Sequence, residues 1–487
     1  MTSRTDLSQF VKAYDVRGLV PQQLDARVAR AIGSAFARVV ALPDGADGIV
    51  VGHDMRPSSP ELSRAFADGA AQHGLDVTLI GLCSTDGLYF ASGHLGLPGA
   101  MFTASHNPAA YNGIKLCRAG ARPVGQDSGL AEIRDLAQAD LDGEAHDTRT
   151  EAAPTATGTV REQDLLRDYA AFLRGLVDLS RPRRSRPIRV VVDAGNGMGG
   201  LTVPAVLGDA AGLPALPLEV VPLYFELDGT FPNHEANPLE PANLVDLQRA
   251  VVEQGADLGL AFDGDADRCF AVDEQGRAIS PSAVTGLIVE RETRRAVAAG
   301  AEPAELTFVH NVITSRAVPE LIAELGARAV RTRVGHSYIK AQMAEHGAVF
   351  GGEHSAHYYF QDFWFADTGM LAAMYLLAAL GEQDDVVSAL VARYDRYRAS
   401  GEINSTVADQ AGRTDQVRRW AGERGLRVDE LDGLTATHEA DGDGRTWWVN
   451  VRPSNTEPLL RLNVEASDQE TMEQVRDEVL AIIRGEA

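Results

Sequence analysis

Short apolar runs alternate with helix-length segments along most of the chain, and this pattern occurs three times. The predicted strands cover residues 48–52, 76–82 and 99–102 in the first copy, 189–193, 218–223 and 258–262 in the second, and 306–310, 329–333 and 348–350 in the third. Strand-length runs that alternate with helices such as 60–73 are typical of α/β domains. We therefore predict three related α/β domains with mixed sheets.

The last predicted strand of each copy leads into a polar loop, at residues 103–108, 263–268 and 351–357. In α/β sheets, ligand-binding groups belong on the loops at the carboxyl ends of strands. Turn chemistry alone does not explain three polar loops at corresponding places, so we expect all three to be functional.

The pattern changes after residue 382. Helices are predicted near 386–397 and 414–424, strands near 446–451 and 459–464, and a final amphipathic helix at 468–484. This indicates a smaller α+β domain at the C-terminal end, and the stretch 144–158 has the composition of a linker. For 487 residues, the usual domain sizes suggest three or four domains. The predicted limits are 1–158, 159–277, 278–388 and 389–487.

Composition narrows the classes of function. The net charge of −24 argues against nucleic acid as a partner and means that an anionic substrate needs a local cluster of basic side chains. Three widely spaced cysteines fit a reducing cytoplasm and make neither a disulfide framework nor a metal cluster. Residues 1–9 lack the apolar core of a signal peptide, and the longest apolar candidate, 370–380, is too short to span a bilayer. We expect a cytoplasmic protein with no membrane partner.

The loop at 103–108, Thr-Ala-Ser-His-Asn-Pro, places the hydroxyl of Ser105 beside the imidazole of His106, with Lys115 shortly after. Asn107-Pro108 forces a turn, because proline pushes the preceding residue out of the α region. A serine can carry covalent catalysis if its surroundings stabilise its anion and the group that it attacks. The alternative is a turn that caps a helix.

Asp263, Asp265 and Asp267 alternate with small residues, so their three carboxylates can converge on one cation. Such hard oxygen ligands suit Mg²⁺, Mn²⁺ or Ca²⁺. An EF-hand is excluded, because its sixth position would be Arg268 instead of glycine and because predicted strands flank the loop. A solvent-facing Asp/Gly turn is the structural alternative. Arg268 is placed to hold a phosphate oxygen.

Two more polar loops offer groups for a sugar phosphate. Residues 452–456 combine a guanidinium, two hydroxyls and an amide in a loop stiffened by Pro453 and Pro458, a set that can bind a phosphate dianion but also fits an ordinary turn. Glu353, Ser355 and His357 alternate on one loop, where Glu353 and Ser355 can bind vicinal sugar hydroxyls. His336 is a further candidate, with a structural histidine as the alternative. The glycine-rich turn at 195–200 does not have the spacing of a dinucleotide-binding motif.

With these motifs the chain resembles the α-D-phosphohexomutase family, which includes bacterial phosphomannomutase/phosphoglucomutase. The matching motifs are KAYDVRG at 12–18, TASHNP at 103–108, NGIK at 112–115, DGDADR at 263–268, GEHSAH at 352–357 and RPSNTEP at 452–458. They run in the family's order over nearly the whole chain. The resemblance implies three related α/β domains and a smaller fourth one around a central cleft.

The resemblance also implies an activity: interconversion of hexose 1-phosphate and hexose 6-phosphate, of mannose or glucose, through a phosphoserine and a hexose 1,6-bisphosphate. It implies Mg²⁺ as cofactor, the bisphosphate as activator, hexose phosphates as partners and a monomer or homodimer. The alternatives are a metal-dependent sugar-phosphate phosphatase, a phosphoglucosamine mutase and a catalytically idle sugar-phosphate binder. Ala356 stands where many relatives carry glycine, and its methyl group tightens the expected sugar-binding loop.

Site roles follow from the same resemblance. Ser105 is the expected phosphoryl carrier, its oxygen joins Asp263, Asp265 and Asp267 on the metal, Lys115 is the acid/base, Arg17 lies near the phosphoserine, and His106 orients the serine. The residues expected to bind substrate are Tyr14, Arg268, His336, Glu353, Ser355, His357, Arg452, Ser454, Asn455 and Thr456. Close to a cation and an arginine, Lys115 should lose its proton more easily than a free lysine.

Overall fold

The computed structural model describes residues 5–143, 156–180, 182–440, 444–454 and 459–486. It divides into two compact units, one formed by residues 1–279 and 355–388 and the other by residues 280–354 and 389–487. The predicted limits of the four domains stay predictions.

The first unit begins with a mixed sheet in the order β1-β5-β4-β2-β3-β7, with β6 paired to β5. Its strands are β1 (Val16–Leu19), β2 (Gly48–His53), β3 (Asp76–Leu82), β4 (Gly99–Phe102), β5 (Tyr111–Arg118), β6 (Arg122–Pro123) and β7 (Val160–Glu162). The helices are α1 (Ala26–Phe36), α2 (Ser59–Ala71), α3 (Thr85–Leu95) and α4 (Leu130–Asp142). Strands β4, β2 and β3 are parallel, so their carboxyl ends lie at one edge of the sheet.

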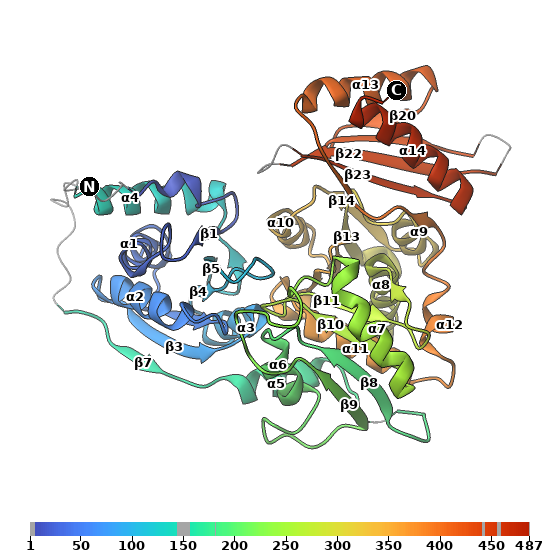
Figure 1. Cartoon of the computed structure of the whole chain (residues 1–487). Coiled ribbons are helices and arrows are strands. Elements are labelled where there is room, and N and C mark those ends of the chain that lie inside the picture. The colour runs from blue at the N-terminus through green and yellow to red at the C-terminus, as the bar shows by residue number, and fades with distance from the viewer. Residues whose placement is uncertain (1–4, 144–155, 181, 441–443, 455–458, 487) are drawn as a thin grey trace. The chain divides into compact units, whose positions relative to one another are not determined.

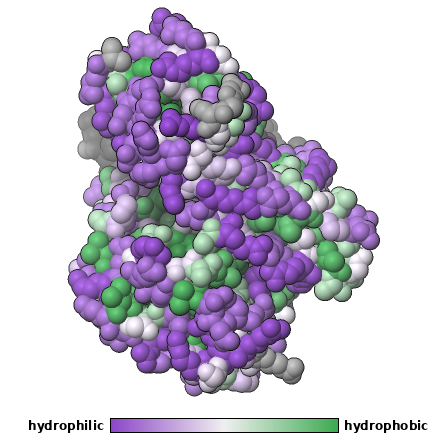
Figure 2. Space-filling view, turned by 90° about the vertical axis from the view of Figure 1, so that its right-hand side faces the viewer, coloured by the Kyte–Doolittle hydropathy of each residue, from purple (hydrophilic) through white to green (hydrophobic). Residues whose placement is uncertain are grey.

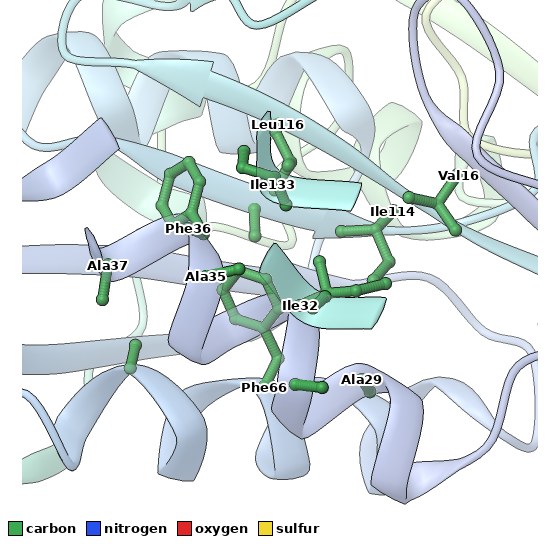
Figure 3. Close-up of a cluster of buried hydrophobic side chains, with 14 of the residues drawn as sticks. Val16, Ala29, Ile32, Ala35, Phe36, Ala37, Phe66, Ile114, Leu116 and Ile133 are labelled. Atoms are coloured by element: carbon green, nitrogen blue, oxygen red, sulfur yellow. The ribbon is translucent and has the colours of Figure 1, made fainter. Parts of the chain in front are cut away.

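Helix α1 packs between α2 and α4 (Figure 1). The core behind it joins Ile32 and Phe36 of α1 to Phe66 of α2 and to Ile114 of β5 (Figure 3). The rings of Phe36 and Phe66 lie 5.7 Å apart, within the range of a favourable aromatic pair. This apolar layer fixes the sheet whose edge carries the serine loop.

The second sheet of this unit has the order β12-β11-β10-β8-β9. Its strands are β8 (Ile188–Asp193), β9 (Leu218–Leu223), β10 (Leu258–Phe262), β11 (Cys269–Val272) and β12 (Ala278–Ile279), with helices α5 (Leu166–Leu176), α6 (Gly199–Val206) and α7 (Val245–Gln254). The hairpin of β16 (Tyr358–Phe360) and β17 (Ala366–Asp367) and helix α11 (Gly369–Gly381) complete the unit.

The second unit holds a parallel array of β13 (Thr307–Asn311), β14 (Arg328–Thr332) and β15 (Phe350–Gly352), with helices α8 (Pro281–Ala298), α9 (Ala317–Glu324) and α10 (His336–His346). Its other sheet runs β18-β23-β22-β21-β20, with β19 paired to β23. Those strands are β18 (Arg398–Ala399), β19 (Ile403–Thr406), β20 (Arg427–Asp429), β21 (Leu434–His438), β22 (Trp447–Pro453) and β23 (Leu459–Ala466), packed on α13 (Gln410–Glu423) and α14 (Gln469–Arg484).

The predicted fold class is confirmed: three α/β regions precede a C-terminal α+β region. The predicted helix at 386–397 is wrong in length, because α12 covers only Val387–Val391 and turns follow it. Several strands that pair antiparallel, among them β1, β5 and β11, have no counterpart among the predicted ones. They complete mixed sheets through pairing with distant strands, which a local apolar pattern does not reveal.

The visible face in Figure 2 carries hydrophobic residues interspersed among hydrophilic ones. Within the part of the chain that the structure describes, no α-helix combines the length and apolar character needed to cross a membrane.

Candidate active site

The serine loop leaves β4 at the carboxyl edge of the first sheet. Ser105 is 3% exposed and has a φ of 49°, in the left-handed region that residues other than glycine seldom adopt. Its N–H donates to the Thr103 hydroxyl over 2.9 Å. A left-handed non-glycine residue costs about 1–3 kcal/mol and persists only when its surroundings hold it. The serine is therefore held by tertiary contacts in a conformation that the chain would not favour alone.

One side chain that holds the serine loop in place is Arg56, which was not predicted from the sequence. Its guanidinium donates to the carbonyl oxygens of Ser105 and Asn107 over 2.9 and 2.7 Å, and to those of Pro108 and Tyr111 over 3.0 and 2.9 Å. The sequence did contain a feature that points to Arg56. This residue follows β2, which lies parallel to and beside β4. The rule that ligand-binding groups follow parallel strands therefore applied to this loop as well.

The aspartate loop between β10 and β11 lies against the serine loop. The Ser105 hydroxyl donates to Asp263 Oδ2 over 2.8 Å, across 158 residues of sequence. Asp263, Asp265 and Asp267 are buried, and one carboxylate oxygen from each lies within 4.8 Å of the others. The structure thus brings the predicted carrier serine and the three predicted ligands into one cluster.

The three carboxylates fit a hard divalent cation. Oδ1 of Asp265 and Oδ1 of Asp267 are buried and have no hydrogen-bond partner among the described residues. An unsatisfied buried acceptor is costly, and a cation held by these oxygens would remove that cost. Burial, together with the neighbouring carboxylates Asp267 and Asp265, raises the pKa of Asp263, although Arg268 opposes the shift. Removal from water therefore opposes the charged form of Asp263 in the absence of a bound cation.

Lys115, on β5, forms ion pairs with two of the three aspartates. Its ammonium is 2.7 Å from Asp265 Oδ2 and 2.6 Å from Asp267 Oδ2. Burial alone would lower the pKa of Lys115, but the two carboxylates raise it well above its usual range. The expectation of an easily lost proton is therefore wrong for this arrangement, because the lysine contacts the carboxylates themselves.

Arg268 and His106 form the next layer around the serine. Arg268 ion-pairs with Asp263 Oδ2 at 2.8 Å and donates to His106 Nδ1. His106 Nδ1 also lies 3.2 Å from the Ser105 hydroxyl. Burial and the adjacent Arg268 keep the pKa of His106 well below its usual range. His106 is therefore a neutral neighbour of Ser105, and the expected orienting role fits this geometry.

Arg17 on β1 contacts the same loop from another side. Its guanidinium donates to Asn107 Oδ1 and, over 3.3 Å, to the Ala104 carbonyl. Asp15 holds its Nε at 2.8 Å. Tyr14 lies three residues before Arg17 in the bend that precedes β1 and is partly exposed. The structure therefore places Arg17 against the serine loop, as expected.

Thr85 is a second residue that sequence reasoning missed. It begins α3, directly after β3 and Ser84, and its hydroxyl donates to Asp265 Oδ2 over 2.5 Å. Its N–H also donates to the Asp265 carbonyl over 3.0 Å. Since β3 is parallel to β2, the end of β3 meets the same edge of the sheet. Thr85 therefore fixes the orientation of one predicted metal ligand.

The loop before β16 adds His357. Its Nε2 lies 3.7 Å from Asp267 Oδ1 and 4.0 Å from Asp367 Oδ2, and its Nδ1 is 3.1 Å from the Ser355 hydroxyl. Ala356 between them is buried with a φ of 65°, which explains why glycine suits this position. Ser355 and His357 thus lie with the aspartate cluster.

The second unit carries the other predicted sugar-binding residues. Glu353 follows β15, and its Oε2 accepts from Asn311 Nδ2 over 2.9 Å and from the Gly335 N–H over 3.3 Å. His336 follows Gly335 at the start of α10. The structure therefore brings Glu353 close to the segment that carries His336. Asn311, at the end of β13, was missed.

Arg452, at the end of β22, is engaged by acidic side chains. Its Nη2 donates to Glu402 Oε2 over 3.2 Å, and its Nη1 lies 3.9 Å from Asp432 Oδ2. The Ser454 N–H donates to the Leu459 carbonyl over 2.8 Å. Asn455 and Thr456 lie outside the described residues. The predicted phosphate-binding arginine is thus paired with carboxylates in this structure.

Comparison with known proteins gives matches to the domains of one family along most of the chain. Residues 8–142, 167–276 and 282–397 match the phosphoglucomutase/phosphomannomutase alpha/beta/alpha domains I, II and III, and residues 402–482 match the C-terminal domain. A protein of Xanthomonas campestris pv. campestris described as "Phosphohexose mutases" is 39% identical over 477 residues, covering 97% of this chain and 99% of its own length.

Two further relatives extend the comparison. The phosphomannomutase of Escherichia coli K12 is 35% identical over 477 residues, with 98% of each chain covered. The X-ray structure of a phosphoglucomutase/phosphomannomutase family protein from Burkholderia thailandensis is 31% identical, with a TM-score of 0.81 and 98% of each chain covered. The chain therefore belongs to the phosphoglucomutase/phosphomannomutase, or α-D-phosphohexomutase, family of phosphotransferase enzymes.

Proposed function

We propose that the protein interconverts hexose 1-phosphate and hexose 6-phosphate by passing a phosphoryl group to and from Ser105. The observation that carries the proposal is the 2.8 Å hydrogen bond from the Ser105 hydroxyl to Asp263, within a buried cluster of three aspartates. Phosphoryl transfer depends mainly on positioning and on neutralising oxygen charge. Arg17, Arg268 and Lys115 surround the serine and can supply that neutralisation.

In this proposal Asp263, Asp265 and Asp267 hold Mg²⁺ together with an oxygen on Ser105. The buried Oδ1 atoms of Asp265 and Asp267 accept no hydrogen bond from any described residue, which supports the assignment. When bound, the ion would stabilise negative charge on the phosphoryl oxygens. Thr85 orients Asp265 from outside this ligand set, as partners of metal ligands commonly do.

Phosphorylated Ser105 gives its phosphoryl group to a hydroxyl at one end of the sugar phosphate. The bond between phosphorus and Oγ breaks, a bond to the sugar oxygen forms, and the proton of that hydroxyl passes to a base. The resulting hexose 1,6-bisphosphate turns round and returns its other phosphoryl group to the Ser105 oxygen. Lys115 can give up a proton once the charges of its two carboxylate partners are neutralised, because the ion pairs with Asp265 and Asp267 stabilise its protonated form and raise its pKa.

Glu353 and Ser355 are proposed to bind sugar hydroxyls, and Arg452, Ser454, Asn455 and Thr456 to hold the phosphate that is not transferred. A loop that binds O3 and O4 leaves C2 without a contact, so mannose and glucose phosphates should both react. Comparable turnover of the two 1-phosphates would support this assignment. A preference above a hundredfold, about 2.7 kcal/mol, would contradict it.

One experiment tests the proposal. The wild-type protein is incubated with mannose 1-phosphate, Mg²⁺ and a trace of glucose 1,6-bisphosphate, and the products are followed by phosphorus NMR. The proposal predicts mannose 6-phosphate. Release of inorganic phosphate would instead indicate a phosphatase, and no change would indicate a sugar-phosphate binder. Parallel reactions with glucose 1-phosphate and glucosamine 1-phosphate identify the sugar, and conversion of glucosamine 1-phosphate alone would indicate a phosphoglucosamine mutase.

A further inference from the structure

We infer that Arg56 is the positioning residue that holds Ser105 in line for phosphoryl transfer. The inference rests on the proposed function, because it assigns Arg56 a role in the reaction at Ser105. Arg56 does not touch the reacting atoms. It acts through the backbone of the serine loop.

The contacts of Arg56 converge on one segment of chain. The guanidinium is 1% exposed, and its two terminal nitrogens donate to four carbonyls between Ser105 and Tyr111. Four carbonyls that point at one centre need several donors in a fixed plane, and the forked guanidinium supplies them. One side chain therefore sets the path of the whole turn that follows the serine.

Arg56 is itself held on its other sides. Asp54 faces its Nε at 3.2 Å and accepts its backbone N–H over 2.9 Å. The ring of Phe231 lies 5.1 Å from the guanidinium carbon. At Gly229 an added Cβ would approach the Arg56 Cα to 2.7 Å, so the chain of the second sheet passes directly against the arginine. Arg56 is thus a rigid support between the β2 edge and the loop.

This support matters because Ser105 has a left-handed backbone, with a φ of 49°. That conformation directs its hydroxyl to Asp263 at 2.8 Å. If the four carbonyls lose their common donor, the turn can relax and the hydroxyl can leave the position of in-line transfer. Lysine keeps the positive charge but offers only a compact ammonium that cannot reproduce the fork.

Arg56→Lys tests the inference against a matched control, Arg184→Lys. Arg184 has an 8% exposed side chain and donates to the carbonyls of Leu380, Gln383 and Asp385 and to Asp257, all in the same unit and outside the site. Both variants should lower the melting temperature, since both lose buried hydrogen bonds. Only Arg56→Lys should lower kcat, by about a hundredfold, with KM for mannose 1-phosphate changed less than about threefold.

The second readout is the rate at which glucose 1,6-bisphosphate loads Ser105, followed by intact-protein mass spectrometry. Loading should slow in Arg56→Lys and stay at the wild-type rate in Arg184→Lys. Wild-type kcat and loading in a folded Arg56→Lys would overturn the inference, as would equal losses in both variants. Failure of the wild-type protein to convert any hexose phosphate would instead contradict the proposed function.

Should Arg56→Lys not fold, Asp54→Asn keeps the side-chain volume and removes the charge that faces Arg56, while position 54 can still accept the Ser59 hydroxyl, which Asp54 Oδ1 accepts over 2.6 Å. We expect about a tenfold lower kcat and an unchanged KM, because the guanidinium stays in place but loses its charged partner. An unchanged loading rate in folded Asp54→Asn would overturn the role of Arg56 as a held support.

Discussion

The Ser105 loop and the Arg452 loop both follow a strand and both carry predicted phosphate chemistry, yet their surroundings differ. Ser105 is 3% exposed and is fixed by Asp263, His106, Thr103 and Arg56. Arg452 has a 13% exposed side chain and shares Glu402 with Arg461. The first loop is fixed by buried contacts, whereas Arg452 is held by partly exposed ion pairs.

The difference teaches how each loop can work. A group that transfers a phosphoryl must stay in place, and buried contacts provide that rigidity. A group that binds and releases an anion must exchange one negative partner for another, and ion pairs near the surface are weak enough to allow it. We therefore expect changes in the first loop to act on kcat and changes in the second to act on KM.

The largest effect is expected for Ser105→Ala. Without the hydroxyl no phosphoryl carrier remains, so turnover of mannose 1-phosphate should fall about a thousandfold or more. Ser63→Ala is the matched control, because Ser63 is also buried and its hydroxyl donates to the Pro60 carbonyl over 3.0 Å, within α2. Steady-state kinetics of both variants measure the effect. Ser105→Ala with wild-type turnover would remove the serine from the reaction.

The next effect concerns the metal. Asp265→Asn removes one of the three proposed ligand charges, and the affinity for Mg²⁺ should fall at least about tenfold. Loss of a residue that only hydrogen-bonds to a metal ligand already lowers metal affinity about tenfold or more, and Asp265 is a proposed ligand itself. Melting temperatures measured over a series of MgCl₂ concentrations report the change in affinity. Asp257→Asn is the control, because Asp257 pairs with Arg184 and Arg186 outside the site. Equal Mg²⁺ dependence in wild type and Asp265→Asn would contradict the proposed metal site.

Arg452→Ala tests the expectation for the second loop, that changes there act on KM. Loss of a charge-assisted contact to the bound phosphate should raise KM for mannose 1-phosphate about 10- to 100-fold, with a smaller change in kcat. Arg461→Ala is the control, since Arg461 pairs with the same Glu402 at 3.3 Å and has no predicted role. If Arg452→Ala lowers kcat as strongly as Ser105→Ala while KM stays unchanged, the two loops do not differ in the way proposed.

The last expected effect is a pH dependence of the free energy of unfolding that comes from the buried Asp86. Burial raises the pKa of Asp86 from 3.8 to about 6, although Ser84, Thr368 and Tyr169 bond to its carboxylate. The folded state then binds the proton more tightly than the unfolded state, so the free energy of unfolding falls as pH rises from about 4 to about 6 and levels off above. The loss amounts to about 3 kcal/mol at most.

Urea unfolding of wild type and Asp86→Asn across this pH range measures the effect. The difference between the two should change between pH 4 and pH 6, because the variant lacks the titrating group. For Asp257→Asn we expect a pH dependence of opposite sign. Burial alone would raise the pKa of Asp257, but its arginine partners outweigh burial and lower it. The stability that Asp257 contributes to the folded state is therefore lost as pH falls. A difference between wild type and Asp86→Asn that does not vary with pH would contradict the shifted pKa.

The local sequence predicted the parts of this protein that follow local rules. Apolar runs located most central strands, including β2, β4, β8 and β10, and polar residues directly after strands located the loops of Ser105 and Asp263. The motifs and their order predicted the family, which the comparisons confirm. These features were readable because strand formation and the edge at which parallel strands end depend on short stretches of chain.

The sequence did not reveal Arg56, Thr85 or the carboxylate partners of Arg452. Arg56 lies 49 residues before Ser105, and Thr85 lies 180 residues before Asp265. The sequence determined which groups the site contains, whereas tertiary structure decided which of them are buried, which are held in a fixed position and which form ion pairs. The physical reason is that burial and charge pairing depend on distances between residues that only folding brings together.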